Sequence, residues 1–177
     1  MFSRLQVNLN ANKMGKVEWE RRRREAELLL VFAAAVYALQ VRSGRHFLHE
    51  HPAGASSWRH PAIAKLHARP GVDTVVANMC EFGMSTSNRA GDRALAKKPT
   101  RFMSSSPAIL EALARRCHDH APLLGGTRAK DAAVYPLGLC RAIAQGATEQ
   151  LRRDDRARSV CGLLAVRSGP GSASTEV

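Results

Sequence analysis

The stretch TRFMSSSPAILEALARRC, residues 100–117, combines a strand and a helix in one short segment. Residues 100–105 are predicted to form a strand. Pro107 then stands in the first turn of a helix that runs to about Cys117, a position where the missing N–H of proline is harmless. A strand that leads directly into a helix indicates an α/β domain.

Two further strands are predicted upstream of this stretch, with a helix between them. The first covers residues 46–51. The second covers residues 72–80, where apolar side chains on both alternating faces predict a central strand covered on both sides. Ser56 and Ser57 are suitable N-caps for the intervening helix, which runs to about Ala68.

Long helices are predicted near both ends of the chain. In the first, residues 17–42, apolar side chains recur at spacings of three and four and predict one stripe facing a core. The stripe consists of Leu29, Phe32, Val36 and Leu39. Pro136 opens the second long helix, whose apolar positions include Leu139, Ile143 and Leu151. Residues 83–92 and 118–130 are predicted to be loops because they are rich in Gly and polar residues.

The order of these elements predicts the fold class and the domain organisation. We expect an α/β domain over residues 16–160, with a small three- to four-stranded sheet flanked by helices. Residues 1–15 are expected to be a flexible leader and residues 167–177 a disordered tail. The length of 177 residues, 45% hydrophobic and 24% charged, fits one globular core and argues against wholesale disorder.

The charge balance favours a polyanionic partner. Lys and Arg number 27 against 15 Asp and Glu, a net charge of +12, and nucleic acid is the simplest partner of that kind. The alternative is that a high-GC genome, which encodes many Arg residues, produces the same excess of positive charge without any partner. The sequence also lacks the GxxxxGK[ST] and GxGxxG patterns, which argues against nucleotide binding by either route.

The chain is predicted to be intracellular, cytoplasmic or nuclear. Its first residues lack the apolar core and cleavage site of a signal peptide, so its four cysteines are expected to be reduced. The longest apolar run, residues 28–39, is too short to span a bilayer. No membrane association is therefore expected.

Two basic segments are candidates for nucleic-acid contact. The first is the run Arg21, Arg22, Arg23 and Arg24. It could neutralise phosphates, but a solvated helix face balanced by neighbouring glutamates is the alternative. The second, Lys97, Lys98 and Arg101, leads into the strand at residues 100–105. It could hold a phosphate backbone, or it could protect an exposed sheet edge.

Two groups of side chains are candidate metal ligands. His49 and His51 lie on one face of a predicted strand, with Glu50 on the other, but zinc needs three or four ligands. Cys117 and His120, joined by Cys80 or Cys140, could form a Cys/His zinc site and make the chain a zinc-dependent structural module. The alternative is that these cysteines are small buried apolar residues.

Several blocks, in order along the chain, carry a resemblance to a known family. They are GRHFLHEHP at 44–52, SW at 57–58, MCEFGM at 79–84, KPTRFM at 98–103, RC at 116–117, VYP at 134–136 and LCRAI at 139–143. Residues 25–146 thereby resemble a domain of retrotransposon polyproteins, especially copia-like elements of dinoflagellate algae. The resemblance implies a mobile-element origin and other polyprotein segments as partners.

A weaker resemblance is to the second half of the cytosine-C5 DNA methyltransferase fold. It rests on the tetrapeptide at 49–52, on Phe82-Gly83 and on the basic segment that follows. It implies a Rossmann-type half in which Glu50 contacts the target base. His51 stands where that family has Asn, and the Gly-rich donor loop and the Pro-Cys nucleophile are absent. The chain is therefore expected to be catalytically incomplete and to carry no cofactor, or to be a degenerate or split methyltransferase-like half that needs an upstream donor-binding segment.

Overall fold

The computed structural model describes residues 15–87, 93–117 and 134–167. The predicted leader and tail lie outside the described residues, except for Gly15 and for Arg167, the last residue of a helix. The predicted loop at 118–130 lies outside them entirely.

A three-stranded antiparallel sheet forms the centre of the molecule. It consists of β1 (Leu48–Pro52), β2 (Asp73–Asn78) and β5 (Pro99–Ser104), in the order β1-β5-β2. The prediction that residues 72–80 form the central strand is wrong, because β2 is an edge strand and β5 is central. Apolar residues on both faces of a strand indicate that both faces are covered by other layers. They do not indicate whether the strand pairs with one neighbouring strand or with two.

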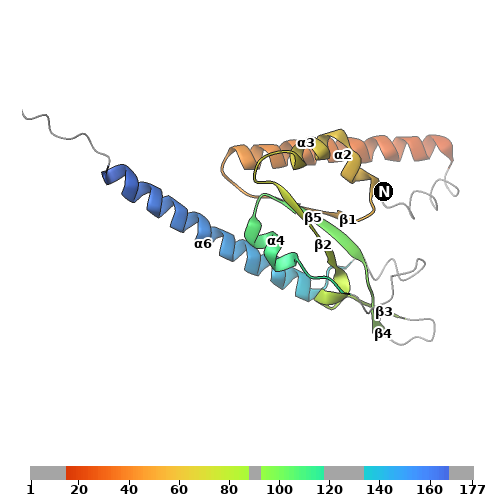
Figure 1. Ribbon diagram of the computed structural model, residues 1–177. Helices are drawn as coiled ribbons and strands as arrows, with labels where there is room; N and C mark the ends of the chain where they lie inside the picture. The colour runs from red at the N-terminus through yellow and green to blue at the C-terminus, as the bar shows by residue number, and fades with distance from the viewer. Residues whose placement is uncertain (1–14, 88–92, 118–133, 168–177) are drawn as a thin grey trace, which may run out of the picture.

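Helices cover both faces of this sheet, which gives three layers (Figure 1). On one face lie α2 (Lys16–Arg42) and α3 (Pro61–His67), and on the other lie α4 (Pro107–Leu113) and α6 (Leu137–Arg167). Consecutive residues of β5 point into the two cores: Phe102 packs with α4 and α6, and Met103 with α2 and α3. The mixed α/β class with a small sheet is thus confirmed.

The bounds of α2 agree with the prediction, but its buried face does not. Leu29 and Phe32, placed in the predicted core stripe, are 68% and 67% exposed. The side that contacts the sheet and α3 is formed by Leu30, Ala34, Tyr37, Ala38 and Val41. Both sets follow spacings of three and four, and they lie on opposite sides of the helix. Spacing alone therefore could not choose between them.

The packing of α6 against α4 brings the two backbones into contact. A Cβ atom added at Gly146 would lie 2.7 Å from the Cα of Ile109, so only glycine fits there. Two hydrogen bonds of 2.8 and 3.0 Å from the guanidinium of Arg153 to the carboxylate of Glu111 join the same helices. Of the apolar positions predicted in α6, Leu139 is buried, whereas Leu151 is 62% exposed.

The helix predicted from Ser56 and Ser57 exists in two pieces. A 3-10 turn, η1 (Ser56–Arg59), is followed by α3, and the N-cap of α3 is His60. Pro61 favours this break, because the residue before a proline avoids helical backbone angles. Ser57 is buried and its hydroxyl contacts Nδ1 of His51 instead of capping a helix.

Two further predictions are corrected near the end of β2. The strand is followed by a 3-10 turn, η2 (Met79–Phe82), and the predicted loop at 83–92 contains β3 (Ser85–Ser87), which pairs with β4 (Arg93–Leu95) in a second antiparallel sheet. The helix predicted over residues 107–117 ends at Leu113.

Every strand pair in the described residues is antiparallel, so the Rossmann-type half implied by the weaker resemblance is not confirmed. In this part of the chain, no helix is both long and apolar enough to cross a bilayer.

Candidate functional site

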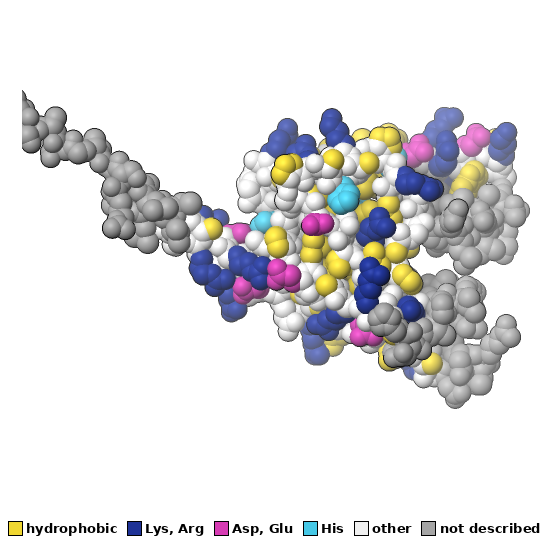
Figure 2. Space-filling model, in the orientation of Figure 1, with side chains coloured by type: hydrophobic (Ala, Val, Ile, Leu, Met, Phe, Trp, Pro, Cys, Tyr) yellow, Lys and Arg dark blue, Asp and Glu magenta, His cyan; other side chains and the backbone are white. Residues whose placement is uncertain are grey.

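Three of the four arginines in the run at residues 21–24 of α2 form ion pairs with neighbouring glutamates. Ion pairs one helical turn apart join Arg21 to Glu18 and Glu25, Arg22 to Glu18, and Arg23 to Glu27. All these side chains are exposed or half-buried. Hydrogen bonds from Arg21 and Arg22 lower the pKa of Glu18 to about 2. Figure 2 shows Lys and Arg mixed with acidic side chains near the start of α2 and along α6. The geometry favours a balanced, solvated face for this run.

A different arginine stacks on an aromatic ring, and a second arginine follows that ring in the chain. The guanidinium of Arg101, on β5, lies 5.2 Å from the centroid of the Trp58 ring. The indole N–H of Trp58 donates a 2.9 Å hydrogen bond to the carbonyl of Pro52, which fixes the ring against β1. Arg59, the next residue in η1, is exposed. Among the described residues, no carboxylate pairs with Arg59 or Arg101.

These side chains border an open hollow of about 300 Å³, which we call the arginine hollow. It is lined by Ala53, Gly54, Ala55, Trp58, Arg59 and Arg101. The N–H of Ala53 donates a 3.0 Å hydrogen bond to the carbonyl of Pro99. That bond places the hollow beside Lys97 and Lys98, both half-buried, where the chain enters β5. Of the three residues in the predicted basic segment, Arg101 thus lines the hollow, and Lys97 and Lys98 lie next to it.

His49 and His51 share a face of β1, as predicted, with ring centroids 4.7 Å apart. Both rings also lie against Trp58, and that of His49 against Tyr37. Burial, and secondarily His51, lower the pKa of His49 to about 4, so its ring is neutral near pH 7. No third metal ligand stands beside the pair in the described part of the chain. Aromatic packing accounts for this pair better than metal binding does.

Glu50 points to the opposite face, where it accepts a 2.8 Å hydrogen bond from the hydroxyl of Tyr135. It borders an open groove of about 630 Å³ along the free edge of β1, between α2 and the start of α6. Burial and the neighbouring Glu50 raise the pKa of Tyr135, so this hydroxyl remains a donor. Glu50 is therefore held in place at a cavity.

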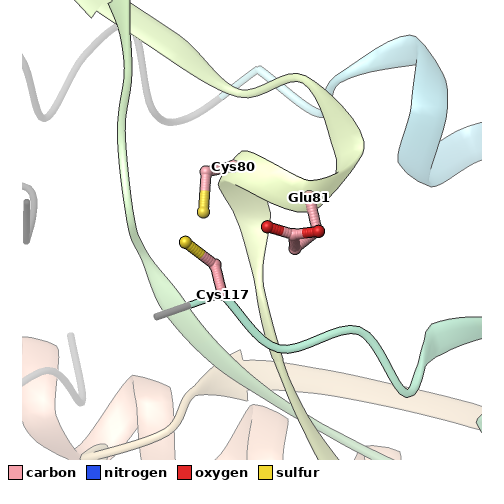
Figure 3. Close-up of side chains that lie close together, drawn as sticks. All are labelled: Cys80, Glu81 and Cys117. Atoms are coloured by element: carbon pink, nitrogen blue, oxygen red, sulfur yellow. The ribbon is translucent and has the colours of Figure 1, made fainter. Parts of the chain in front are cut away.

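The structure also brings two of the four cysteines close together as free thiols. Cys80 lies in η2 and Cys117 in the segment after α4, and both are buried. Their sulfur atoms and a carboxylate oxygen of Glu81 all lie within 4.8 Å of one another (Figure 3). Burial and the adjacent Cys117 raise the pKa of the Cys80 thiol to about 11. Of the two partners left open for Cys117, the structure brings Cys80 beside it, whereas Cys140 is exposed. His120 lies outside the described residues.

Three residues of these sites were not predicted from the sequence. Trp58 and Arg59 follow the serines that were interpreted as helix caps, and an adjacent Trp-Arg pair beside a strand is the signal that could have found them. Glu81 directly follows Cys80 in the sequence. This Cys-Glu pair indicates a possible metal ligand only once Cys117 is known to lie beside it.

No family model, curated protein or solved structure matches the chain.

Proposed function

We propose that this chain is a catalytically incomplete α/β domain of the retrotransposon-polyprotein type that associates with nucleic acid through the arginine hollow. The observation that carries the proposal is the pair Arg59 and Arg101, which border an open hollow without a described carboxylate partner. The resemblance seen in the sequence supports the origin, and the net charge of +12 supports the class of partner.

The shape and chemistry of the hollow suit a phosphate group. Ala53, Gly54 and Ala55 provide a wall with almost no side chains, so a nucleic-acid backbone can approach closely. The stacking of Arg101 on Trp58 orients its guanidinium, whose planar donors match phosphate oxygens. The lysines beside the hollow extend the positive potential along the path that a strand of nucleic acid would follow.

The arginine run of α2 is assigned a lesser role. Three of its members already pair with glutamates, and those carboxylates reduce the positive potential that a phosphate would meet. The two basic segments therefore differ in their expected contribution, and this difference can be measured.

The test is a salt titration of binding to a labelled oligonucleotide, followed by fluorescence anisotropy. If Arg59, Arg101 and a lysine each neutralise one phosphate, the plot of log K against log salt has a slope of about −2 to −3. Arg59→Ala and Arg101→Gln each reduce the steepness by about 1, uniformly across sequences. Arg101→Lys keeps the charge and should retain most of the slope while losing the planar stack.

Arg21→Ala is the matched control, because it removes one arginine that is already paired with Glu18 and Glu25. It should leave the slope nearly unchanged. The proposal is overturned if binding does not depend on salt, or if Arg21→Ala reduces the slope while the variants at Arg59 and Arg101 do not.

A second candidate function is a degenerate or split DNA methyltransferase-like half that needs a separate segment to bind S-adenosylmethionine. The placement of Glu50 at the groove beside β1 favours it. The antiparallel order β1-β5-β2 and the missing Gly-rich loop and Pro-Cys pair place it second. It predicts that Glu50→Gln weakens binding to duplexes with an unpaired cytosine more than to duplexes with an abasic site. Equal effects on both would refute it.

A further inference from the structure

The end of β2 and the segment after α4 bring together three atoms that can ligate a metal. They are the two sulfur atoms of Cys80 and Cys117 and a carboxylate oxygen of Glu81, all within 4.8 Å of one another. In Figure 3 the two sulfur atoms point toward each other and the Glu81 carboxylate lies on the same side of η2. The group combines two soft ligands with one hard ligand.

The backbone around these residues is held in place by hydrogen bonds. The side-chain amide of the buried Asn78 donates to the carbonyl of Cys117 over 3.1 Å, and its backbone N–H donates to the carbonyl of Arg115 over 2.9 Å. The guanidinium of Arg115 lies 5.2 Å from the ring centroid of Phe82, at the other end of η2. The segment that carries Cys117 is therefore fixed against the turn that carries Cys80 and Glu81.

We propose that Cys80, Cys117 and Glu81 form a zinc-binding site. In tetrahedral zinc sites, Zn–S and Zn–O distances of about 2.3 and 2.0–2.2 Å place the ligand atoms about 3.5–3.8 Å apart. The spacing observed here requires only small changes of the side-chain rotamers. Thiolate ligands select zinc over the hard ions magnesium and calcium. A water molecule completes the coordination at the side where Glu81 is exposed.

Binding balances as an exchange of one ion for two protons. Each thiol loses its proton to solvent, one Zn–S bond forms at each sulfur, and the carboxylate oxygen of Glu81 adds without a further proton. No oxidant or reductant takes part. The bound ion joins η2 to the segment after α4 and thereby ties the end of β2 to the α4 side of the fold.

The experiment uses the full chain, reduced and stripped of metal, titrated with cobalt(II) as a spectroscopic substitute for zinc. We expect one ion per chain, the visible bands of tetrahedral cobalt and a near-ultraviolet thiolate charge-transfer band. Adding zinc to the cobalt-loaded protein should abolish these bands, and adding zinc to the metal-free protein should release about two protons per ion. Cys80→Ser and Cys117→Ser should lose the charge-transfer band largely or completely. Glu81→Gln should keep it but weaken binding by at least about 10-fold, since losing even a supporting partner has that effect.

Cys140→Ser is the matched control, because Cys140 is exposed and lies outside this group, and its spectrum should equal that of the unchanged protein. The zinc displacement and proton release are measured on the unchanged protein, so the test holds even if a cysteine variant fails to fold. The proposal is overturned if no charge-transfer band forms. It is also overturned if Cys140→Ser loses the band while Cys117→Ser keeps it.

Discussion

Replacing Gly146 by Ala tests the closest contact between the helices. A Cβ atom at this position would lie 2.7 Å from the Cα of Ile109 and 3.0 Å from the carbonyl oxygen of Ala108. Both are backbone atoms of α4, so no rotation of a side chain relieves the overlap. The two helices would have to separate, and the core formed by Leu113, Leu139 and their neighbours would loosen.

Two effects of opposite sign determine the outcome. Within a helix, Gly→Ala normally adds about 1 kcal/mol of stability through helix propensity. Overpacking a closed interior costs about 1–3 kcal/mol, and the upper part of that range applies because the contacted atoms are backbone. We therefore expect Gly146→Ala to lower the free energy of unfolding by about 1–2 kcal/mol.

Urea unfolding, followed by far-ultraviolet circular dichroism, measures this change. The control is Ala144→Gly, an exposed site on the same helix, which should lose about 1 kcal/mol from propensity alone. Opposite substitutions two residues apart should thus both destabilise the protein. If Gly146→Ala is as stable as the unchanged protein or more stable, α4 and α6 do not approach each other as closely as described.

Three further predictions concern stability and are checked by the same unfolding experiment. Leu30→Ala should cost about 2–5 kcal/mol because Leu30 is 4% exposed, whereas Leu29→Ala, at a residue 68% exposed, should change stability by less than about 0.5 kcal/mol; equal losses would contradict the assigned face of α2. Burial lowers the pKa of His49 to about 4, below its value of about 6.5 in the unfolded chain. The folded state then binds fewer protons, so the stability that the neutral ring provides is complete above pH 6.5 and falls by about 2–3 kcal/mol as the pH drops toward 4. His49→Asn should remove this part of the pH dependence, and an unchanged profile would refute the burial of a neutral ring. Gly83 ends η2 with a φ of +86°, so Gly83→Ala should cost about 1 kcal/mol although a Cβ atom there meets nothing within 4 Å; a neutral result would show that this backbone conformation is not required.

Local signals in the sequence placed several elements correctly. Pro107 marked the start of α4 because proline at the first turn needs no hydrogen-bond partner, and β5 precedes it as predicted. The long helix α2 was also found within one residue of its bounds. Such signals act within a few residues, so they can be read without knowledge of the rest of the fold.

The errors arise where a residue's role depends on distant parts of the chain. Leu29 and Leu30 are adjacent leucines with the same propensity, and only the position of the sheet decides which is buried. In the same way, Cys117 has two candidate partners in the sequence, and only the packing of its segment against η2 selects Cys80. Arg101 was predicted as a candidate for nucleic-acid contact from its charge. Its stacking on Trp58 depends on β5 lying beside η1, which no local pattern in the sequence predicts.

The strand order β1-β5-β2 has a consequence for the route by which the chain folds. The two outer strands are made first during synthesis, and neither pairs with the other; both await β5, whose residue Ser104 pairs with Leu48 and with Asp73. Until β5 emerges, both earlier strands expose unpaired backbone groups that other chains can capture. Contacts between such distant residues slow folding. The nascent chain therefore cannot form any strand pair of this sheet before β5 is synthesised. Until then, the chain is prone to aggregation.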